Sequence, residues 1–193
     1  MAEPRSAGPD KPGPAGRKAG HFDLCAASAT LAPMDSPRRK PLRLPGFDHA
    51  RPGAHFVTIN VADGICLLGS VVNGEMRLND LGRIVDQAWR DLPPHFPSIE
   101  LDAYVVMPNH FHAVLVIANA GGAALPAIIG TFKSQSTRAA NRHRRVENVP
   151  LWHRGYHDHI VRDDADLARI RAYIANNPAC WEQDEVHPAR HRR

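Results

Sequence analysis

Cysteine is scarce in this sequence, and long apolar runs are missing from it. The 193 residues include three cysteines, widely spaced at Cys25, Cys66 and Cys180. An odd number at this spacing argues against a disulfide framework and against a cysteine-based zinc site, so we expect a reducing, cytoplasmic location. No apolar stretch approaches the roughly 20 residues that a membrane helix needs. Residues 24–34 are too short and too poorly flanked for a signal sequence, so we expect no membrane association.

The motifs of two common enzyme classes are also missing. The chain has no HExxH, which argues against a metalloprotease, and no glycine-rich loop that ends in Lys-Ser or Lys-Thr, which argues against a nucleoside triphosphatase. The formal charge of +4 and the pI of about 9.2 favour a polyanionic partner.

Composition divides the chain into three parts. Residues 1–41 are rich in proline, glycine, alanine and arginine and show no apolar period, so they predict a disordered tail. Residues 42–182 show the periodic apolar patterns of one folded domain. Residues 183–193 end in the letters RHRR and predict a basic C-terminal tail.

The domain is predicted to be of the α+β class. Alternating apolar and polar side chains predict strands at residues 55–61, 101–106, 110–117 and 156–161. Asn73-Gly74 predicts an inserted hairpin within residues 66–78. Helical spacing predicts a helix after Asn79 or Asp80, a second around residues 125–132, and a third that Pro178 ends. Without the hairpin the order is β-α-β-β-α-β-α, the ferredoxin-like split βαβ arrangement with an antiparallel sheet and an added C-terminal helix.

Two histidines interrupt the most apolar strand, YVVMPNHFHAVLVI at residues 104–117. Side chains alternate between the faces of a strand, so His110 and His112 share one face and Phe111 lies on the other. Two imidazoles about 7 Å apart along one face can bind a single divalent metal ion. The alternative is a pair of core histidines that hydrogen-bond to their neighbours.

The segment MPNHFH resembles the His-hydrophobe-His (HUH) motif of single-strand DNA nucleases, in the form found in REP-associated tyrosine transposases. Further segments resemble that family in the same order, from about Arg43 to Trp181: RLPGFD at 43–48, GAHFVTI at 53–59, NGEMRLN at 73–79, IIGTFKS at 128–134, LWHRGYHDHIVR at 151–162 and YIANNP at 173–178. Met34 lies shortly before this region, which leaves open whether the residues that precede it belong to the native protein.

The resemblance implies a nucleophile and a metal site. It assigns the nucleophile to Tyr173, while Tyr156, which stands beside His157, Asp158 and His159, is the alternative from the residues alone. It also implies a third ligand to a Mg²⁺ or Mn²⁺ ion. Asn177 fits because it follows Tyr173 by one helical turn, although a residue before proline avoids helical angles. His159 is the competing ligand.

A basic face is predicted next to this site. The candidate DNA contacts are Lys133, Ser134, Arg138, Asn141, Arg142 and Arg145, together with Arg154 and Arg162 at the last strand.

The leading hypothesis is a metal-dependent DNA endonuclease and strand transferase. It would form a 5′-phosphotyrosine on single-stranded or hairpin DNA, as a monomer or a homodimer. The alternatives are a non-catalytic nucleic-acid-binding protein on the same fold and a phosphodiesterase that acts through water.

Overall fold

The computed structural model describes residues 52–118 and 122–190. The tail predicted at residues 1–41, the first ten residues of the predicted domain (42–51), and the last three residues of the basic tail lie outside these ranges. No helix in the described ranges is long and apolar enough to cross a membrane.

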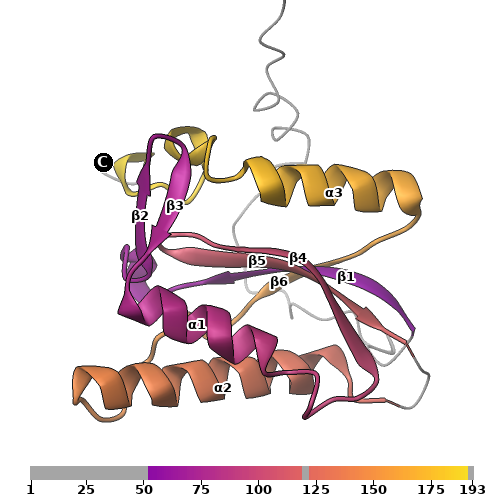
Figure 1. Ribbon diagram of the computed structural model, residues 1–193, viewed down its shortest axis with the longest axis horizontal. Coiled ribbons are helices and arrows are strands. Elements are labelled where there is room, and N and C mark those ends of the chain that lie inside the picture. The colour runs from indigo at the N-terminus through magenta and orange to yellow at the C-terminus, as the bar shows by residue number, and fades with distance from the viewer. Residues whose placement is uncertain (1–51, 119–121, 191–193) are drawn as a thin grey trace, which may run out of the picture.

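A four-stranded antiparallel sheet forms the centre of the domain (Figure 1). Its strands are β1 (Gly53–Asn60), β4 (Ile99–Val106), β5 (His110–Ile117) and β6 (His157–Ile160), in the spatial order β4-β5-β1-β6. The chain runs from β1 through a helix to β4, but β5 lies between these two strands in the sheet, so this βαβ unit is split. This order and the antiparallel pairing confirm the predicted ferredoxin-like α+β class.

Helices cover both faces of this sheet (Figure 1). The helices α1 (Asp80–Arg90) and α2 (Leu125–Arg144) lie on one face, and α3 (Asp164–Asn176) lies on the other. The predicted hairpin is present as β2 (Gly69–Val72) and β3 (Glu75–Leu78), which form a separate two-stranded sheet. Short 3-10 turns occur at Ala62–Gly64, Trp181–Gln183 and Pro188–Arg190.

Local sequence signals explain where several of these elements begin. The Asn79 side chain caps α1 by accepting the Gly82 N–H at 2.9 Å. Asn73 and Gly74 take left-handed φ angles of 54° and 77°, as a two-residue hairpin turn requires.

The expectation that Pro178 moves Asn177 out of helical angles is wrong. Asn177 has φ −56° and ψ −42°, and its N–H donates to the Ile174 carbonyl at 3.3 Å. The local pre-proline preference gives way here because the Asn177 side chain is buried against the C-terminal segment. Asn177 therefore continues the helical turn that follows Tyr173.

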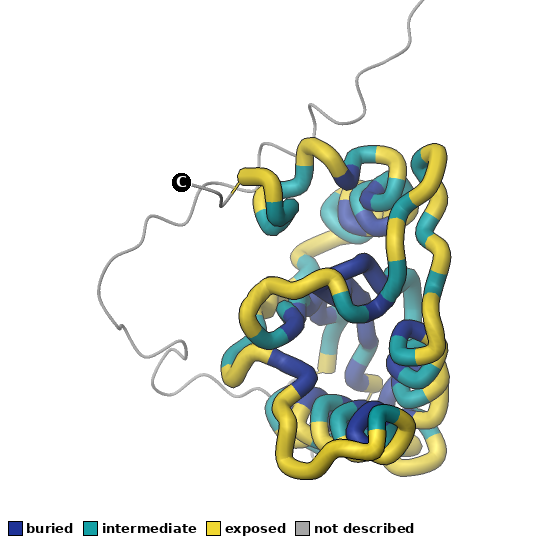
Figure 2. Tube along the Cα trace, turned by 90° about the vertical axis from the view of Figure 1, so that its left-hand side faces the viewer, coloured by how far each residue is buried: buried dark blue, intermediate teal, exposed yellow. Residues whose placement is uncertain are grey.

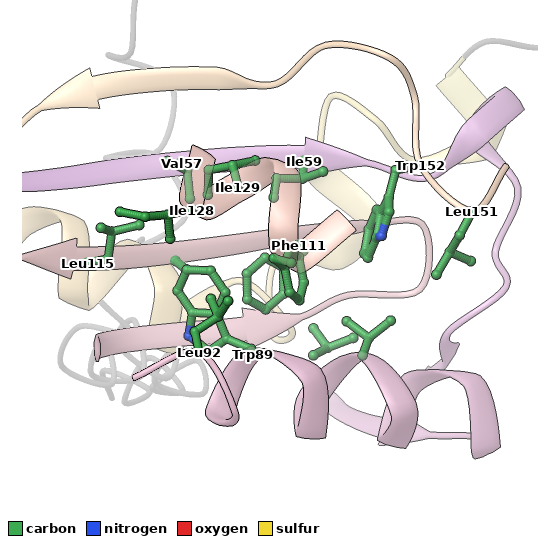
Figure 3. Packing of buried hydrophobic residues seen from close by; sticks show 14 of the residues in the cluster. Val57, Ile59, Trp89, Leu92, Phe111, Leu115, Ile128, Ile129, Leu151 and Trp152 are labelled. Carbon is green, nitrogen blue, oxygen red and sulfur yellow. The ribbon is translucent and has the colours of Figure 1, made fainter. Parts of the chain in front are cut away.

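The two faces of the sheet carry cores of different size. On β5, Phe111 and Leu115 point toward α1 and α2 and pack in the main core with residues such as Trp89 (Figure 3). Val114 points the other way, into a smaller cluster beneath α3. The buried parts of the trace gather at the sheet and at the inner sides of the helices (Figure 2). The alternation of β5 therefore directs His110 and His112 to the α3 face.

Candidate active site

His110 and His112 lie side by side beneath α3, as the alternation in the strand predicts. The centroids of their rings are 4.5 Å apart, and the two residues are only 0% and 5% exposed. Their shared face also carries Thr58, because β1 pairs Thr58 with His112 in the sheet register.

The protonation of His110 follows from its neighbour Asn109. The Asn109 amide nitrogen donates to the carbonyls of Gly64 and Val186, at 3.1 and 2.7 Å. Its amide oxygen therefore faces the Nδ1 atom of His110, at 3.0 Å, and accepts a hydrogen bond from the N–H of that nitrogen. The Nε2 atom of His110 is then left with its lone pair. It is buried and has no hydrogen-bond partner. A histidine held in this way by a second residue presents one defined nitrogen to a ligand.

His112 is placed between a threonine and a tyrosine. Its Nδ1 lies 2.8 Å from the Thr58 hydroxyl, and its Nε2 lies 3.2 Å from the hydroxyl of Tyr173. When Nδ1–H donates to Thr58, Nε2 accepts a hydrogen bond from the phenol of Tyr173. An ion bound at Nε2 would take over this lone pair and release the phenol.

Burial keeps both histidines neutral near pH 7. It lowers the pKa of His110 to about 4, although the charge of Asp184 and the nearby amide of Asn177 act in the opposite direction. Burial also lowers the pKa of His112 well below its ordinary value, and the neighbouring His110 lowers it further. Metal ions bind the neutral imidazole, so these residues are ready to act as ligands.

The free energy of unfolding of the metal-free protein is expected to fall as the pH falls from about 6.5 toward 4. The unfolded chain protonates His110 at its ordinary pKa of about 6.5, whereas the folded chain keeps it neutral down to about 4. Between these values the unfolded state binds more protons, so stability is lost as the pH falls. The difference between 6.5 and about 4 corresponds to about 3 kcal/mol. Urea unfolding in the presence of EDTA measures the loss, which should be clearly smaller in His110→Gln. An equal loss in that variant would contradict the assignment.

Tyr173 reaches the histidines from α3. Its ring packs edge-on against Phe56, with centroids 6.0 Å apart, and lies 5.2 Å from the ring of His112. Burial raises the pKa of the phenol, the charges of Asp184 and Glu185 raise it further, and a hydrogen bond with Asn177 lowers it. The phenolate is therefore unfavourable here without an added positive charge.

The other two tyrosines lie on the opposite face of the sheet. Tyr156 packs against the main core on the α1 and α2 side. Tyr104 also packs there, and its hydroxyl bonds to Asp86 and to Arg90. Tyr173 is thus the tyrosine that shares a face with both histidines.

Asn177 and Asp184 close the site from the C-terminal side. Asn177 is 3% exposed, and its amide nitrogen donates to Oδ2 of Asp184 at 3.3 Å, while its amide oxygen is buried without a partner. The same Asp184 oxygen lies 3.8 Å from Nε2 of His110. Among the described residues, the ligand atoms of His110, His112 and Asp184 form a group within 4.8 Å.

Asp184 was not among the ligands expected from the sequence, which were His110, His112 and Asn177, with His159 as the competing third ligand. Asp184 follows a three-residue 3-10 turn, and so short a turn has no apolar period that could indicate it from the sequence. Asp184 also falls in the predicted basic tail. The one sequence signal was an acidic run that directly follows Trp181. His159 bonds to Asp166 at 2.9 Å near the start of α3 and does not belong to the group.

The residues that converge here suit a divalent ion. Two buried acceptor atoms, Nε2 of His110 and the amide oxygen of Asn177, have no hydrogen-bond partner, which costs roughly 1–3 kcal/mol for each atom. Imidazole nitrogens and an amide oxygen are suitable ligands for Mn²⁺, and for Mg²⁺ when water and phosphate oxygens complete the shell.

The predicted basic face lies on α2, across the sheet from the histidines (Figure 1). Its exposed members are Ser134, Arg138, Arg142 and Arg145, and Arg154 and Arg162 are exposed on either side of β6. Arg138 and Arg142 line a shallow groove between α2 and residues 146–154.

Two residues of the predicted basic face form hydrogen bonds within the protein. The Lys133 ammonium donates to the carbonyls of His153, Arg154 and Gly155, at 2.6 to 3.2 Å. Asn141 is buried and donates to the carbonyl of Val149 at 2.9 Å. Both side chains thus hold the segment that leads to β6.

Three comparisons relate the chain to known proteins. The profile of a family described as "Transposase IS200 like" matches residues 89–177. An uncharacterized protein of Haemophilus influenzae is 34% identical over 169 residues, which cover 77% of this chain and 93% of that protein. Another Haemophilus influenzae protein, whose name assigns it to the REP-associated tyrosine transposases, is 27% identical over 140 residues, or 68% of this chain and 73% of that protein.

A solved structure of a REP-associated tyrosine transposase bound to a REP hairpin has a similar fold. It matches with a TM-score of 0.54 at 21% identity, over 79% of this chain and 77% of that chain.

Proposed function

Because the chain belongs to the family of IS200-like transposases, which includes the REP-associated tyrosine transposases, we propose that it is a metal-dependent DNA endonuclease and strand transferase with Tyr173 as its nucleophile. One observation supports this most directly. The hydroxyl of Tyr173 lies 3.2 Å from Nε2 of His112, so the phenol stands at the candidate metal ligands.

His110, His112 and Asn177 are proposed to hold a Mg²⁺ or Mn²⁺ ion. When bound, the ion polarises the scissile phosphodiester and offsets the charge that builds up on its oxygens. The raised pKa of the phenol makes attack by Tyr173 unfavourable without this positive charge. We therefore expect cleavage to depend strictly on the metal.

The chemistry of the proposed step is a transesterification. The Tyr173 oxygen forms a bond to phosphorus while the bond between phosphorus and the 3′ oxygen breaks. The phenol gives its proton to water, and the 3′ oxygen takes a proton from water. The products are a 5′-phosphotyrosine and a free 3′-hydroxyl, which together retain the bond energy for rejoining strands.

The DNA is proposed to contact the exposed arginines of α2, among them Arg138 and Arg142. Arg154 and Arg162 flank β6, the edge strand of the sheet, which lies between the α2 and α3 layers. Backbone contacts of this kind position a strand and carry little sequence information. By analogy with the hairpin in the structure of the related transposase, we propose hairpin-forming single-stranded DNA as the substrate.

The test is to trap a covalent adduct. A labelled pool of single-stranded oligonucleotides with hairpins is incubated with the full chain and Mn²⁺ and run on a denaturing gel. We expect a slowly migrating protein–DNA species that is absent when EDTA replaces Mn²⁺. DNA that is retained in a native gel without any adduct would contradict the enzyme and support the binding-protein alternative.

A further inference from the structure

We propose that Asp184 is an anionic ligand of the ion, so that the ion binds this protein before DNA arrives and fastens residues 181–190 to the sheet. The inference rests on the proposed metal-dependent function and extends it to a residue outside the ligand set proposed above.

Asp184 and His110 face each other through two acceptor atoms. Because Nδ1 of His110 donates to Asn109, Nε2 carries a lone pair, and this lone pair faces a carboxylate oxygen across 3.8 Å. Two acceptor atoms have no attraction for each other unless a cation lies between them. Two buried acceptor atoms that face each other in this way are typical of a metal site without its ion.

A further buried acceptor belongs to Asn177, which contacts Asp184. The amide nitrogen of Asn177 donates to Asp184, and its amide oxygen is buried without a partner. The ligand atoms of His110, His112 and Asp184 lie within 4.8 Å of one another. Two ligand atoms that each bind an ion at about 2.2 Å, on opposite sides of it, are about 4.4 Å apart. Small rotations of the side chains would therefore bring these three ligand atoms to bonding distance.

The two Asp184 oxygens have different partners. Oδ1 accepts the Val186 N–H at 2.9 Å and fixes the carboxylate within its own turn. Oδ2 lies toward His110 and Asn177. The carboxylate is therefore oriented by its own backbone before any ion binds.

Charge explains why Asp184 decides the order of binding. The imidazoles of His110 and His112 and the amide of Asn177 are neutral, and the affinity of a site for a hard divalent ion rises with the number of charged ligands. If these neutral groups were the complete protein set, the DNA phosphate would be the first anionic ligand. With Asp184 the protein supplies one itself, and the ion binds without DNA.

The C-terminal segment, residues 181–190, contacts the site without an ion. Trp181 is buried, with its ring 6.0 Å from that of His110, and His187 packs on Trp181 at 4.7 Å. The Val186 carbonyl accepts from Asn109 at 2.7 Å. Ligation by Asp184 would add a bond through the metal to these contacts and reduce the local opening of the segment.

The experiment is a titration of the DNA-free full chain with Mn²⁺, after EDTA treatment, by calorimetry. The wild type should bind one ion. Asp184→Asn, which keeps an acceptor for the Val186 N–H, should weaken binding by about tenfold to a hundredfold. The matched control is Glu182→Gln, which changes an exposed acidic residue of the same segment and should bind as the wild type does. Hydrogen exchange of the amides of residues 181–190 should slow when Mn²⁺ is added to the wild type, and much less in Asp184→Asn at the same Mn²⁺ concentration.

Two outcomes would overturn the inference. One is Asp184→Asn binding Mn²⁺ as tightly as the wild type, and the other is a wild type that binds no Mn²⁺ without DNA. Neither outcome alone removes the proposed function, which the adduct assay with DNA and saturating Mn²⁺ tests separately. Thermal unfolding in EDTA shows whether Asp184→Asn is folded. If it is not, the wild-type hydrogen exchange decides, and unchanged exchange at residues 181–190 when Mn²⁺ binds overturns the inference.

Discussion

Replacing Tyr173 with phenylalanine is expected to reduce formation of the covalent DNA adduct by at least about a thousandfold, since loss of a nucleophile removes the chemical step itself. The ring remains, so its packing against Phe56 and His112 and the fold should persist. Binding of Mn²⁺ should also persist, because the Tyr173 hydroxyl is not a proposed ligand. Its loss leaves the Nε2 lone pair of His112 available to the ion. Denaturing gels measure the adduct, and calorimetry measures the metal.

The matched control is Tyr156→Phe, which removes a hydroxyl on the opposite face of the sheet. It should form the adduct at close to the wild-type rate. If Tyr156→Phe loses the adduct and Tyr173→Phe keeps it, the nucleophile is assigned to the wrong tyrosine. If Tyr173→Phe still cleaves DNA without an adduct, attack by water replaces the tyrosine mechanism.

Replacing His112 with alanine is expected to weaken Mn²⁺ binding by about a hundredfold or more and to abolish the adduct. The variant removes a proposed ligand and, at the same time, the atom that bonds to the Tyr173 hydroxyl. Calorimetry with Mn²⁺ and the adduct gel, on one preparation, separate the two effects. A protein that keeps its Mn²⁺ affinity would show that His112 is an ordinary core residue.

His159→Ala provides the control for this experiment. His159 lies on the same face of the sheet, because β6 pairs it with Phe56, but its ring is engaged with Asp166. The variant should keep the Mn²⁺ affinity of the wild type within about twofold. A loss as large as that of His112→Ala would restore His159 as a candidate ligand.

The fold was predictable because its signals are local and periodic. The strand that carries the histidines has a period of two in a strongly apolar run, so the face that His110 and His112 share followed from the sequence. The Asn79 cap and the Asn73-Gly74 turn were read in the same way. Each of these signals lies within a few residues of the structure that it specifies.

The parts of the site that could not be predicted depend on contacts between distant segments. Alternation sets Tyr156 opposite its neighbour His157, but only the register that pairs His157 with Thr58 shows which of them lies on the face of the two histidines. Asp184 approaches His110 through a segment without any period. Helical spacing indicated that Lys133 lies on a basic face, but it did not reveal that a later segment places three carbonyls around the ammonium.

The hydrogen bond from Asn109 to the carbonyl of Val186 has a consequence for protein synthesis. The sheet and its three helices are complete at Asn176, whereas this carbonyl leaves the ribosome later. Until then the Asn109 amide nitrogen has one carbonyl acceptor, that of Gly64, instead of two, so the amide that orients His110 is held less firmly. A chain whose translation stops soon after α3 therefore contains Tyr173 and both histidines but lacks one of the two contacts that hold Asn109 beside His110.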